Sequence, residues 1–191
     1  ITLRYTSEVM LENERNHLNT LVNTLPDLVW LKNPDGVYLH CNDRFEQFFG
    51  HPRDAIIGHT DYDFVDRELA DSFRQHDRLA MQASGPVSNE EWITFASDGR
   101  RELLETTKTP MLDREGRIIG VLGIGHDITA TRQAMGALRE SEAYNKVLFA
   151  NSHIPLVVMD PDSGRLLDCN QAAVNVYGLV DQATLLGLSV E

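Results

Sequence analysis

Residues 30–42 read Trp-Leu-Lys-Asn-Pro-Asp-Gly-Val-Tyr-Leu-His-Cys-Asn, and residues 158–170 read Val-Met-Asp-Pro-Asp-Ser-Gly-Arg-Leu-Leu-Asp-Cys-Asn. Each stretch places a Pro-Asp pair and a glycine between two apolar runs. Because proline fixes φ and glycine accepts positive φ, each stretch predicts a β-hairpin. The copies align without a gap, which pairs Gly36 with Gly164, Cys41 with Cys169 and Asn42 with Asn170.

The repeat extends on both sides of the hairpin, and such a repeat decides how the chain is divided. The further matched positions are Leu11 and Leu21 with Leu138 and Leu148, Gly50 with Gly178 and, after one inserted residue, Gly58 with Gly187. A unit of helix, strand, turn, strand and helix is therefore expected twice. The second copy stops at Glu191, so we expect it to be cut short, and the first residue, Ile1, suggests an excised piece.

The segments around the first hairpin predict helices. Leucines at helical spacing predict a helix over residues 6–24, which Pro26 ends because its ring cannot continue the hydrogen bonding. Asn42 is a good N-cap for a short helix, Asp43–Phe49, and residues 52–64 predict short helical turns. These elements lead into a longer helix from Asp66 to about Ala83.

Three strands and a helix follow the long helix. The strands are expected at Val87–Ala96, Arg101–Leu112 and Arg117–Ile128, joined by turns that contain glycine. The helix is expected at Thr129–Asn151, with a weak coiled-coil stripe of small residues. Five strands in one antiparallel sheet with helices on one face define an α+β fold class.

Composition and charge exclude several kinds of protein. The chain has 191 residues, of which 42% are hydrophobic, and a net charge of −12. This charge disfavours binding to nucleic acid and to an anionic membrane surface. No apolar run approaches the ~20 residues that span a bilayer, so we expect no direct membrane contact. Two cysteines do not form a disulfide framework and favour a cytoplasmic location.

The combined motifs resemble the PAS domain family. The residues that carry the resemblance are Trp30–Lys32, Pro34–Gly36, Asn42, Gly50, Gly58–Phe64 (Gly-His-Thr-Asp-Tyr-Asp-Phe), Gly85, Lys108–Pro110, Asp113–Gly116, Gly120 and Asp127–Thr129. The resemblance implies the strand order 2-1-5-4-3. It implies an N-terminal linker helix (1–25), a complete PAS domain (26–131), a connecting helix (132–152) and the front of a second PAS domain (153–191).

PAS folds enclose a cavity, and the first copy supplies apolar residues to line or fill it. An aromatic cavity with a few polar groups can bind a small ligand. The expected lining residues are Trp30, Phe45, Phe48, Ile57, Phe64, Phe73, His76, Leu79, Trp92, Thr94, Leu104 and Val121, with Phe49, Phe95 and Ile124 in the same apolar set and Tyr38, His40 and Thr106 as further polar candidates.

The end of the first copy is a candidate for signal transmission. Asp127 or Thr129 can cap the helix that follows, with Ile128 between them. In PAS proteins a similar tripeptide couples the sheet to the outgoing helix. A cap with no signalling role is the alternative.

Cofactor and metal sites are weakly indicated. Haem-binding PAS domains use a histidine on the long helix, but His76 lies among polar residues, so we expect a rim or surface histidine and no haem. Flavin-binding relatives need a cysteine in the stretch that here is 59–64, where none occurs. His51, His59, Asp61 and Asp63 lack the spacing of a zinc site, and turn and cap chemistry explains the two aspartates. Glu90, Glu91 and Glu105 are expected on a solvated strand face.

The sequence thus predicts a sensory input segment of a bacterial signalling protein and no enzyme activity in the segment itself. Ligand, redox state or a partner would change its packing, and the outgoing helix would pass the change to an effector in the same chain, a diguanylate cyclase or a histidine kinase. A parallel homodimer is expected through the flanking helices, with Leu11, Leu18, Leu21 and Leu25 in the seam. The alternatives are a structural dimerisation spacer without a ligand and a haem-based redox or gas sensor.

Overall fold

The computed structural model describes residues 2–83 and 85–177, which fall into two compact units. The first unit is Ile1–Ala130 and the second is Thr131–Glu191. The expected repeat positions Gly178 and Gly187 lie outside the described residues. Each unit is considered by itself below.

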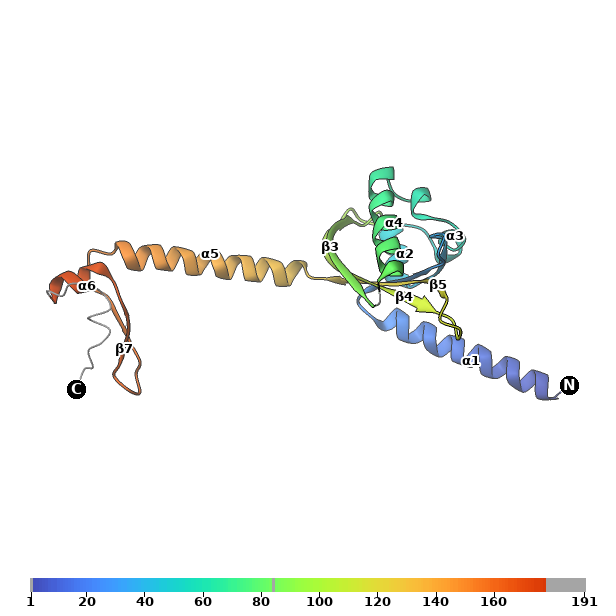
Figure 1. Ribbon diagram of the computed structural model, residues 1–191, viewed down its shortest axis with the longest axis horizontal. Coiled ribbons are helices and arrows are strands. Elements are labelled where there is room, and N and C mark those ends of the chain that lie inside the picture. The colour runs from blue at the N-terminus through green and yellow to red at the C-terminus, as the bar shows by residue number, and fades with distance from the viewer. Residues whose placement is uncertain (1, 84, 178–191) are drawn as a thin grey trace. The chain divides into compact units, whose positions relative to one another are not determined.

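The first unit contains a five-stranded antiparallel sheet (Figure 1). Its elements are α1 (Thr2–Thr24), β1 (Leu28–Lys32), β2 (Tyr38–Cys41), α2 (Asp43–Phe49), α3 (Arg53–Ile56), the 3-10 helix η1 (Asp61–Asp63), α4 (Arg67–Gln82), β3 (Val87–Thr94), β4 (Arg101–Leu112) and β5 (Ile118–Asp127). The strand order is β2-β1-β5-β4-β3, so the α+β class and the order 2-1-5-4-3 are confirmed.

The central strand β5 contains three glycines, and two of them, Gly123 and Gly125, make room for large side chains of the neighbouring strands. Gly123 pairs with Trp30 of β1 on one side and with Lys108 of β4 on the other. A Cβ atom on Gly123 would lie 2.2 Å from the Trp30 ring, so the indole needs a glycine here. Gly125 likewise leaves room for Leu104. The sheet is therefore shaped to accept large side chains from its neighbouring strands.

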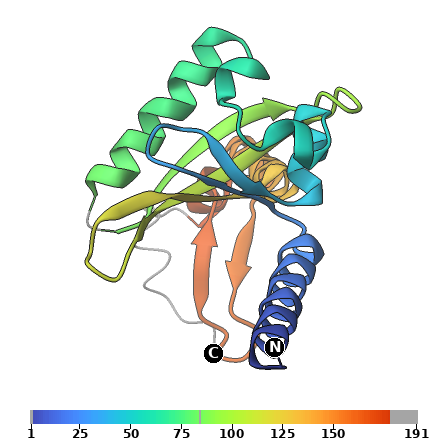
Figure 2. The same ribbon diagram turned by 90° about the vertical axis from the view of Figure 1, so that its right-hand side faces the viewer.

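Helices α2 and α4 cover one face of this sheet (Figure 2). Because successive side chains of a strand point to opposite faces of the sheet, every second residue faces these helices. In β4 these residues are Glu102, Leu104, Thr106 and Lys108, all of them buried. The aromatic rings of α2 lie on the same side of the sheet, and the ring centroids of Phe45 and Phe49 are 4.8 Å apart. The core therefore lies between the sheet and the helices.

The second unit repeats the beginning of the first. It contains α5 (Thr129–Asn151, which starts at the end of the first unit), the two-stranded sheet β6 (Val157–Met159) and β7 (Leu166–Cys169), and α6 (Gln171–Val176). The predicted second hairpin and the helix after it are present. All three residues of β6 are exposed, and among the described residues of this unit the buried apolar cluster is Leu166, Cys169, Ala173 and Val174.

One asparagine plays the same role in both units. The Asn42 side-chain oxygen accepts from the N–H groups of Val29 and Phe45, and its amide donates to the carbonyls of Val22 and Asp27. It therefore fastens the end of α1 to β1 and to the first turn of α2.

Asn170 repeats this arrangement in the second unit. Its oxygen accepts from Leu156 and Ala173, and its amide donates to the carbonyls of Ser152 and Ile154. The cap predicted at Asn42 is confirmed, and the repeat seen in the sequence is a repeat of contacts.

The helices α1 and α5 keep most of their surface in solvent within their own units. The expected seam residues of α1 are exposed, with Leu11 at 66%, Leu18 at 58%, Leu21 at 63% and Leu25 at 44%. No residue between Thr129 and Asn151 is buried. In the part of the chain that the structure describes, no helix combines the length and the apolar character needed to cross a bilayer.

Candidate functional site

A cavity lies in the core of the first unit, between the sheet and the helices. Strands β1, β2, β3 and β4, the helices α2 and α4 and the short η1 all contribute to its wall. It encloses about 20 Å³ of free space, which holds about one water molecule. Its lining residues are Leu28, Trp30, Lys32, Tyr38, Phe45, Phe48, Asp61, Phe73, Glu91, Ile93, Leu104, Thr106 and Lys108.

Four buried charged side chains form a cluster at the cavity, and three of them, Lys32, Asp61 and Lys108, line it. The Lys32 ammonium donates to both carboxylate oxygens of Asp61, at 2.7 and 2.6 Å, and to Asp77 at 3.1 Å. The Lys108 ammonium donates to Asp77 at 2.6 Å and to the carbonyl of Phe73 at 3.0 Å. Two ammonium groups thus face two carboxylates, and each side chain is at most 2% exposed. The Arg74 guanidinium, 3.4 Å from Asp77, adds a third cation at the edge of the cluster.

Burial and pairing set the protonation states of this cluster. Burial alone would raise the pKa of Asp77, but the ammonium groups of Lys32 and Lys108 hold it below its ordinary value. Burial lowers the pKa of Lys108, and Asp77 opposes that shift. Burial and the Asp61 carboxylate raise the pKa of Tyr38 well above its ordinary value. Tyr38 therefore keeps its proton and donates it to Asp61 at 2.6 Å.

The cavity is also lined by uncharged donors and one further carboxylate. The hydroxyl of Thr106 donates to the half-buried Glu91 at 3.0 Å. The Trp30 side chain is 7% exposed, and within the described residues its indole N–H has no hydrogen-bond partner. A buried N–H without a partner costs free energy, so Trp30 is a candidate group for contact with a ligand or a water molecule.

The structure brings part of the expected lining set together. Trp30, Phe45, Phe48, Phe73 and Leu104 line the cavity, as do the polar candidates Tyr38 and Thr106. The other expected residues do not line it.

Two of the displaced residues lie on β3 and point the other way. Trp92 is 51% exposed and stacks with Arg101, and Thr94 is also exposed. Glu91 and Ile93 take the inward positions instead. Glu91 was expected on a solvated strand face, and this expectation is wrong. The sequence suggested that the side of β3 with Trp92 faces the core, but it is the side with Glu91 that does so.

Ile57, Phe64 and Val121 belong to the packing around the cavity without lining it. Ile57 and Phe64 pack on the outside of the core, and Phe64 stacks on Phe49 with ring centroids 4.6 Å apart. Val121 is buried opposite Lys32 at one end of the sheet. Of the wider apolar set, Phe49 and Phe95 are buried in the core, whereas Ile124 is 36% exposed.

The histidines and one helical leucine lie away from the cavity. His76 contacts the carbonyl of Ser72 one turn earlier on α4 through Nδ1, at 2.9 Å. His40 contacts Asn19 of α1 at 2.9 Å, and Leu79 is 46% exposed. In residues 2–83 and 85–177, no three His, Cys, Asp or Glu side chains are placed to hold a metal ion.

The charged residues of the cavity were missed by sequence reasoning. Asp61 was interpreted as a turn residue, but it is fully buried against Lys32, whereas Asp63 does cap the turn by accepting from Thr60. Two signals could have shown the cluster. Lys32 has the inward parity of Trp30 in β1, and Asp77 lies four residues after Phe73 on the buried face of α4.

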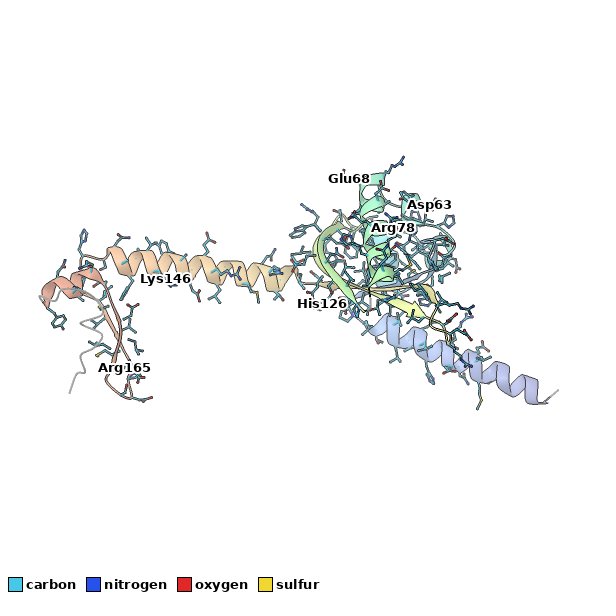
Figure 3. All side chains as sticks on the ribbon, viewed as in Figure 1. Asp63, Glu68, Arg78, His126, Lys146 and Arg165 are labelled. Carbon is cyan, nitrogen blue, oxygen red and sulfur yellow. The ribbon has the colours of Figure 1, made fainter. Side chains whose placement is uncertain are left out.

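The end of β5 is tied to β4 and to the start of α5. The Asp127 carboxylate accepts from the backbone N–H and the hydroxyl of Thr129, at 2.9 and 2.6 Å. Thr129 Oγ1 accepts in turn from the N–H of Leu103, and the Ile128 N–H donates to the Leu103 carbonyl. Hydrogen bonds thus join β4 directly to the end of β5 and to the first residue of α5. Nearby His126, labelled in Figure 3, contacts Asp27 at 2.7 Å.

Sequence comparison explains this architecture. Residues 22–133 match a family model described as the PAS fold, and residues 143–190 match another described as a PAS domain. The chain belongs to the PAS family. The chain thus holds one PAS domain whose five strands are all described and, after it, a match to a second one.

Several similar curated proteins have the names of signalling proteins. The aerobic respiration control sensor protein ArcB of Escherichia coli is 27% identical over 141 residues, which are 74% of this chain and 18% of ArcB. The methanogenesis regulatory histidine kinase FilI of Methanothrix harundinacea is 26% identical over 83% of this chain and 17% of FilI. A Vibrio cholerae diguanylate cyclase is 30% identical over 64% of this chain and 39% of the enzyme. The chain therefore spans a minor part of each relative.

Solved structures share the fold. A phage VqmA–DPO complex superposes with a TM-score of 0.53 at 26% identity, over 74% of this chain and 63% of VqmA. The PAS domain of Bordetella pertussis BvgS gives a TM-score of 0.51 at 24% identity, over 68% of this chain and 98% of that domain. The similarity to the BvgS domain concerns the fold alone.

Proposed function

We propose that this chain is the sensory input region of a cytoplasmic signalling protein and that the cavity of its first PAS domain binds a small ligand. The observation that carries the proposal is the cavity itself, which combines aromatic walls with a buried N–H that lacks a partner at Trp30. Small-molecule sites have this mixture of apolar lining and a few polar groups. The similar phage VqmA structure is a complex with DPO, which supports the proposal that this fold can hold a ligand.

The output of the proposed module runs through β4 and β5 to α5. Leu104, Thr106 and Lys108 line the cavity from β4, and the neighbouring Leu103 is bonded to Thr129 at the start of α5. A change in cavity packing that shifts β4 therefore shifts the helix. Asp127, Ile128 and Thr129 are the proposed transmission residues. The effector would be a histidine kinase or a diguanylate cyclase, as in the relatives, in a part of the protein outside these residues.

Purification of the 191-residue chain tests whether the cavity is occupied. Native mass spectrometry compared with denaturing mass spectrometry should show a ligand that is lost on unfolding, and an absorption spectrum identifies a chromophore. We expect no Soret band after reconstitution with haemin, because His76 lies away from the cavity lining and contacts Ser72. A Soret band that His76→Ala abolishes would establish the haem sensor instead.

A structural dimerisation spacer is the second candidate, and one observation favours it. The free space of about 20 Å³ leaves no room for a ring-sized ligand unless side chains move. A spacer needs only its interface. Leu18 is 58% exposed on α1, so Leu18→Glu should weaken a homodimer formed through this helix. Sedimentation velocity measures the dimer, and an unchanged dissociation constant would remove α1 from the interface.

A further inference from the structure

One residue of the cavity lining reaches solvent. All the lining residues are buried except Glu91, which is half-buried. The wall that these residues form is therefore closed to solvent everywhere but at Glu91.

Glu91 lies where the core ends along β3. Among the side chains on the inner side of this strand and just beyond it, Ile93 is 2% exposed and Phe95 is 0% exposed. Toward the start of the strand, Glu91, Asn89 and Val87 are half-buried. The strand is the outermost one next to β4, and α4 is in contact with it (Figure 1). An opening at Glu91 therefore lies at the free edge of the sheet, beside α4.

The Glu91 side chain is held less firmly than the other carboxylates of the site. Within the described residues it makes one hydrogen bond, accepting at 3.0 Å from the hydroxyl of the fully buried Thr106. Asp61 and Asp77, by contrast, each accept from at least two buried side chains. A half-buried carboxylate that leaves a single partner regains hydrogen bonds to water. Glu91 is thus the carboxylate that can turn away from the cavity at the smallest cost.

We propose that Glu91 is the gate of the cavity. When its side chain turns away from Thr106 into solvent, a path opens at the edge of β3 by which water or a small ligand enters, and the return of the carboxylate to Thr106 closes that path. The closed cavity holds about one water molecule, so water is the probe that fits it. The entry of a ligand rests on the proposed ligand-binding function, whereas the path itself can be tested with water alone.

Trp30 supplies a probe of this path. It lines the cavity, and within the described residues its indole N–H has no hydrogen-bond partner. Exchange of this proton with solvent therefore requires the arrival of water but not the breaking of a hydrogen bond. The chain has two tryptophans, so the variant Trp92→Phe leaves one indole N–H signal in the NMR spectrum and assigns it to Trp30.

The test measures exchange of the Trp30 indole N–H by NMR on the 191-residue chain. Glu91→Ala shortens the gate and Thr106→Val removes its hydrogen bond, so each should raise the exchange rate at least about fivefold. Glu91→Gln keeps the length and an oxygen acceptor, so the rate should stay within about twofold of the natural one. The matched control Glu90→Ala shortens the neighbouring, exposed glutamate and should leave the rate unchanged.

A backbone amide separates gating from unfolding. The N–H of Val29 donates to Asn42 in the same unit, and its exchange should keep the natural rate in all four variants. An unchanged Trp30 rate in Glu91→Ala would overturn the gate, as would an equal rise at Val29 or in Glu90→Ala. Failure of the proposed ligand binding gives a different result, in which native mass spectrometry shows no ligand while Trp30 exchange still responds to Glu91→Ala.

Discussion

The strands β1 and β6 begin two copies of one sequence unit, but they are buried to different extents. Leu28 and Trp30 of β1 are 1% and 7% exposed, whereas Val157 and Met159 of β6 are 41% and 48% exposed. Both strands pair with the second strand of their hairpin, but β1 also pairs with β5 along its whole length. The burial of an apolar strand therefore depends on the strands that pair with it and not on its own sequence pattern.

Burial differs between the two copies, but the hydrogen bonds at the end of each hairpin do not. Asn42 and Asn170 make the same kinds of hydrogen bonds, although Asn42 follows a strand of a five-stranded sheet and Asn170 follows a strand of a two-stranded one. The turn and cap chemistry of a PAS domain thus forms from a short segment, whereas the cavity requires strands that are far apart in the chain. The following changes test this division, beginning with the largest expected effect.

Asp77→Ala should be the most damaging change. It leaves Lys108 buried without its carboxylate, and breaking a buried ion pair on one side costs about 3–5 kcal/mol. Both tryptophans of the chain, Trp30 and Trp92, lie in the first unit, so urea unfolding followed by their fluorescence reports that unit alone. The control Asp162→Ala changes an exposed turn residue of the second unit. A loss below about 1 kcal/mol for Asp77→Ala would show that the cluster is not structural.

The same residue predicts a pH dependence. The pKa of Asp77 is lowered in the folded protein, so its contribution is present above the ordinary pKa of aspartate. That contribution is lost as the pH falls through the lowered value. The first unit should therefore lose stability in acid more steeply in the natural chain than in Asp77→Ala. Parallel acid profiles for the two proteins would contradict this expectation.

Asn42→Ala and Asn170→Ala compare the two copies directly. Asn42→Ala should lower the stability of the first unit by about 2 kcal/mol, because it removes an N-cap and leaves buried carbonyls without a donor. Asn170→Ala should leave the fluorescence transition unchanged and speed hydrogen exchange at Leu156 and Ala173. A shifted fluorescence transition in Asn170→Ala would show that the two units stabilise each other.

Asp127→Ala tests the connection at the end of β5. It removes a carboxylate that accepts from Thr129, and the loss of such a cap costs about 1 kcal/mol. Hydrogen exchange should increase at Thr129 and at Leu103, whose N–H is bonded to the Thr129 hydroxyl. In the full-length protein, effector activity should change more than stability does. If effector activity still responds normally to the signal in folded Asp127→Ala protein, the role of residues 127–129 is purely structural.

The smallest expected effect concerns His126 and Asp27. The hydrogen bond to Asp27 raises the pKa of His126 above 6.5, and partial burial opposes the shift. The pair therefore stabilises the fold below the ordinary pKa and loses that effect as the pH rises through the raised value. The His126 side chain is 59% exposed, so solvent screening keeps the effect below about 1 kcal/mol. An NMR titration should show a lower His126 pKa in Asp27→Asn, and an equal pKa would refute the pairing.

Sequence reasoning recovered elements more completely than it recovered the cavity. The hairpin, the cap at Asn42 and the three long strands depend on local signals, and they were predicted within a few residues. The parity of β3 depends on its register with β4, which local sequence does not encode. The adjacent pairs Glu90–Glu91 and Trp92–Ile93 break the usual alternation, so Trp92 was assigned inward and Glu91 outward.

The buried charges were harder to predict, because each looks like an ordinary surface residue by itself. Lys32, Asp61 and Asp77 lie far apart in the sequence and become partners only when β1, η1 and α4 pack together. Burial of a lysine is rare unless it is paired, so a single position gives no reason to expect it.

The Trp30 ring over Gly123 has an evolutionary consequence. Even an alanine at position 123 would place its methyl group 2.2 Å from the indole, so neither position can gain volume alone. Related chains should therefore show covariation between the two positions, with a large ring facing glycine or a small side chain facing a larger one. The mutational path between these states is ordered, because the ring must shrink before the glycine can be replaced.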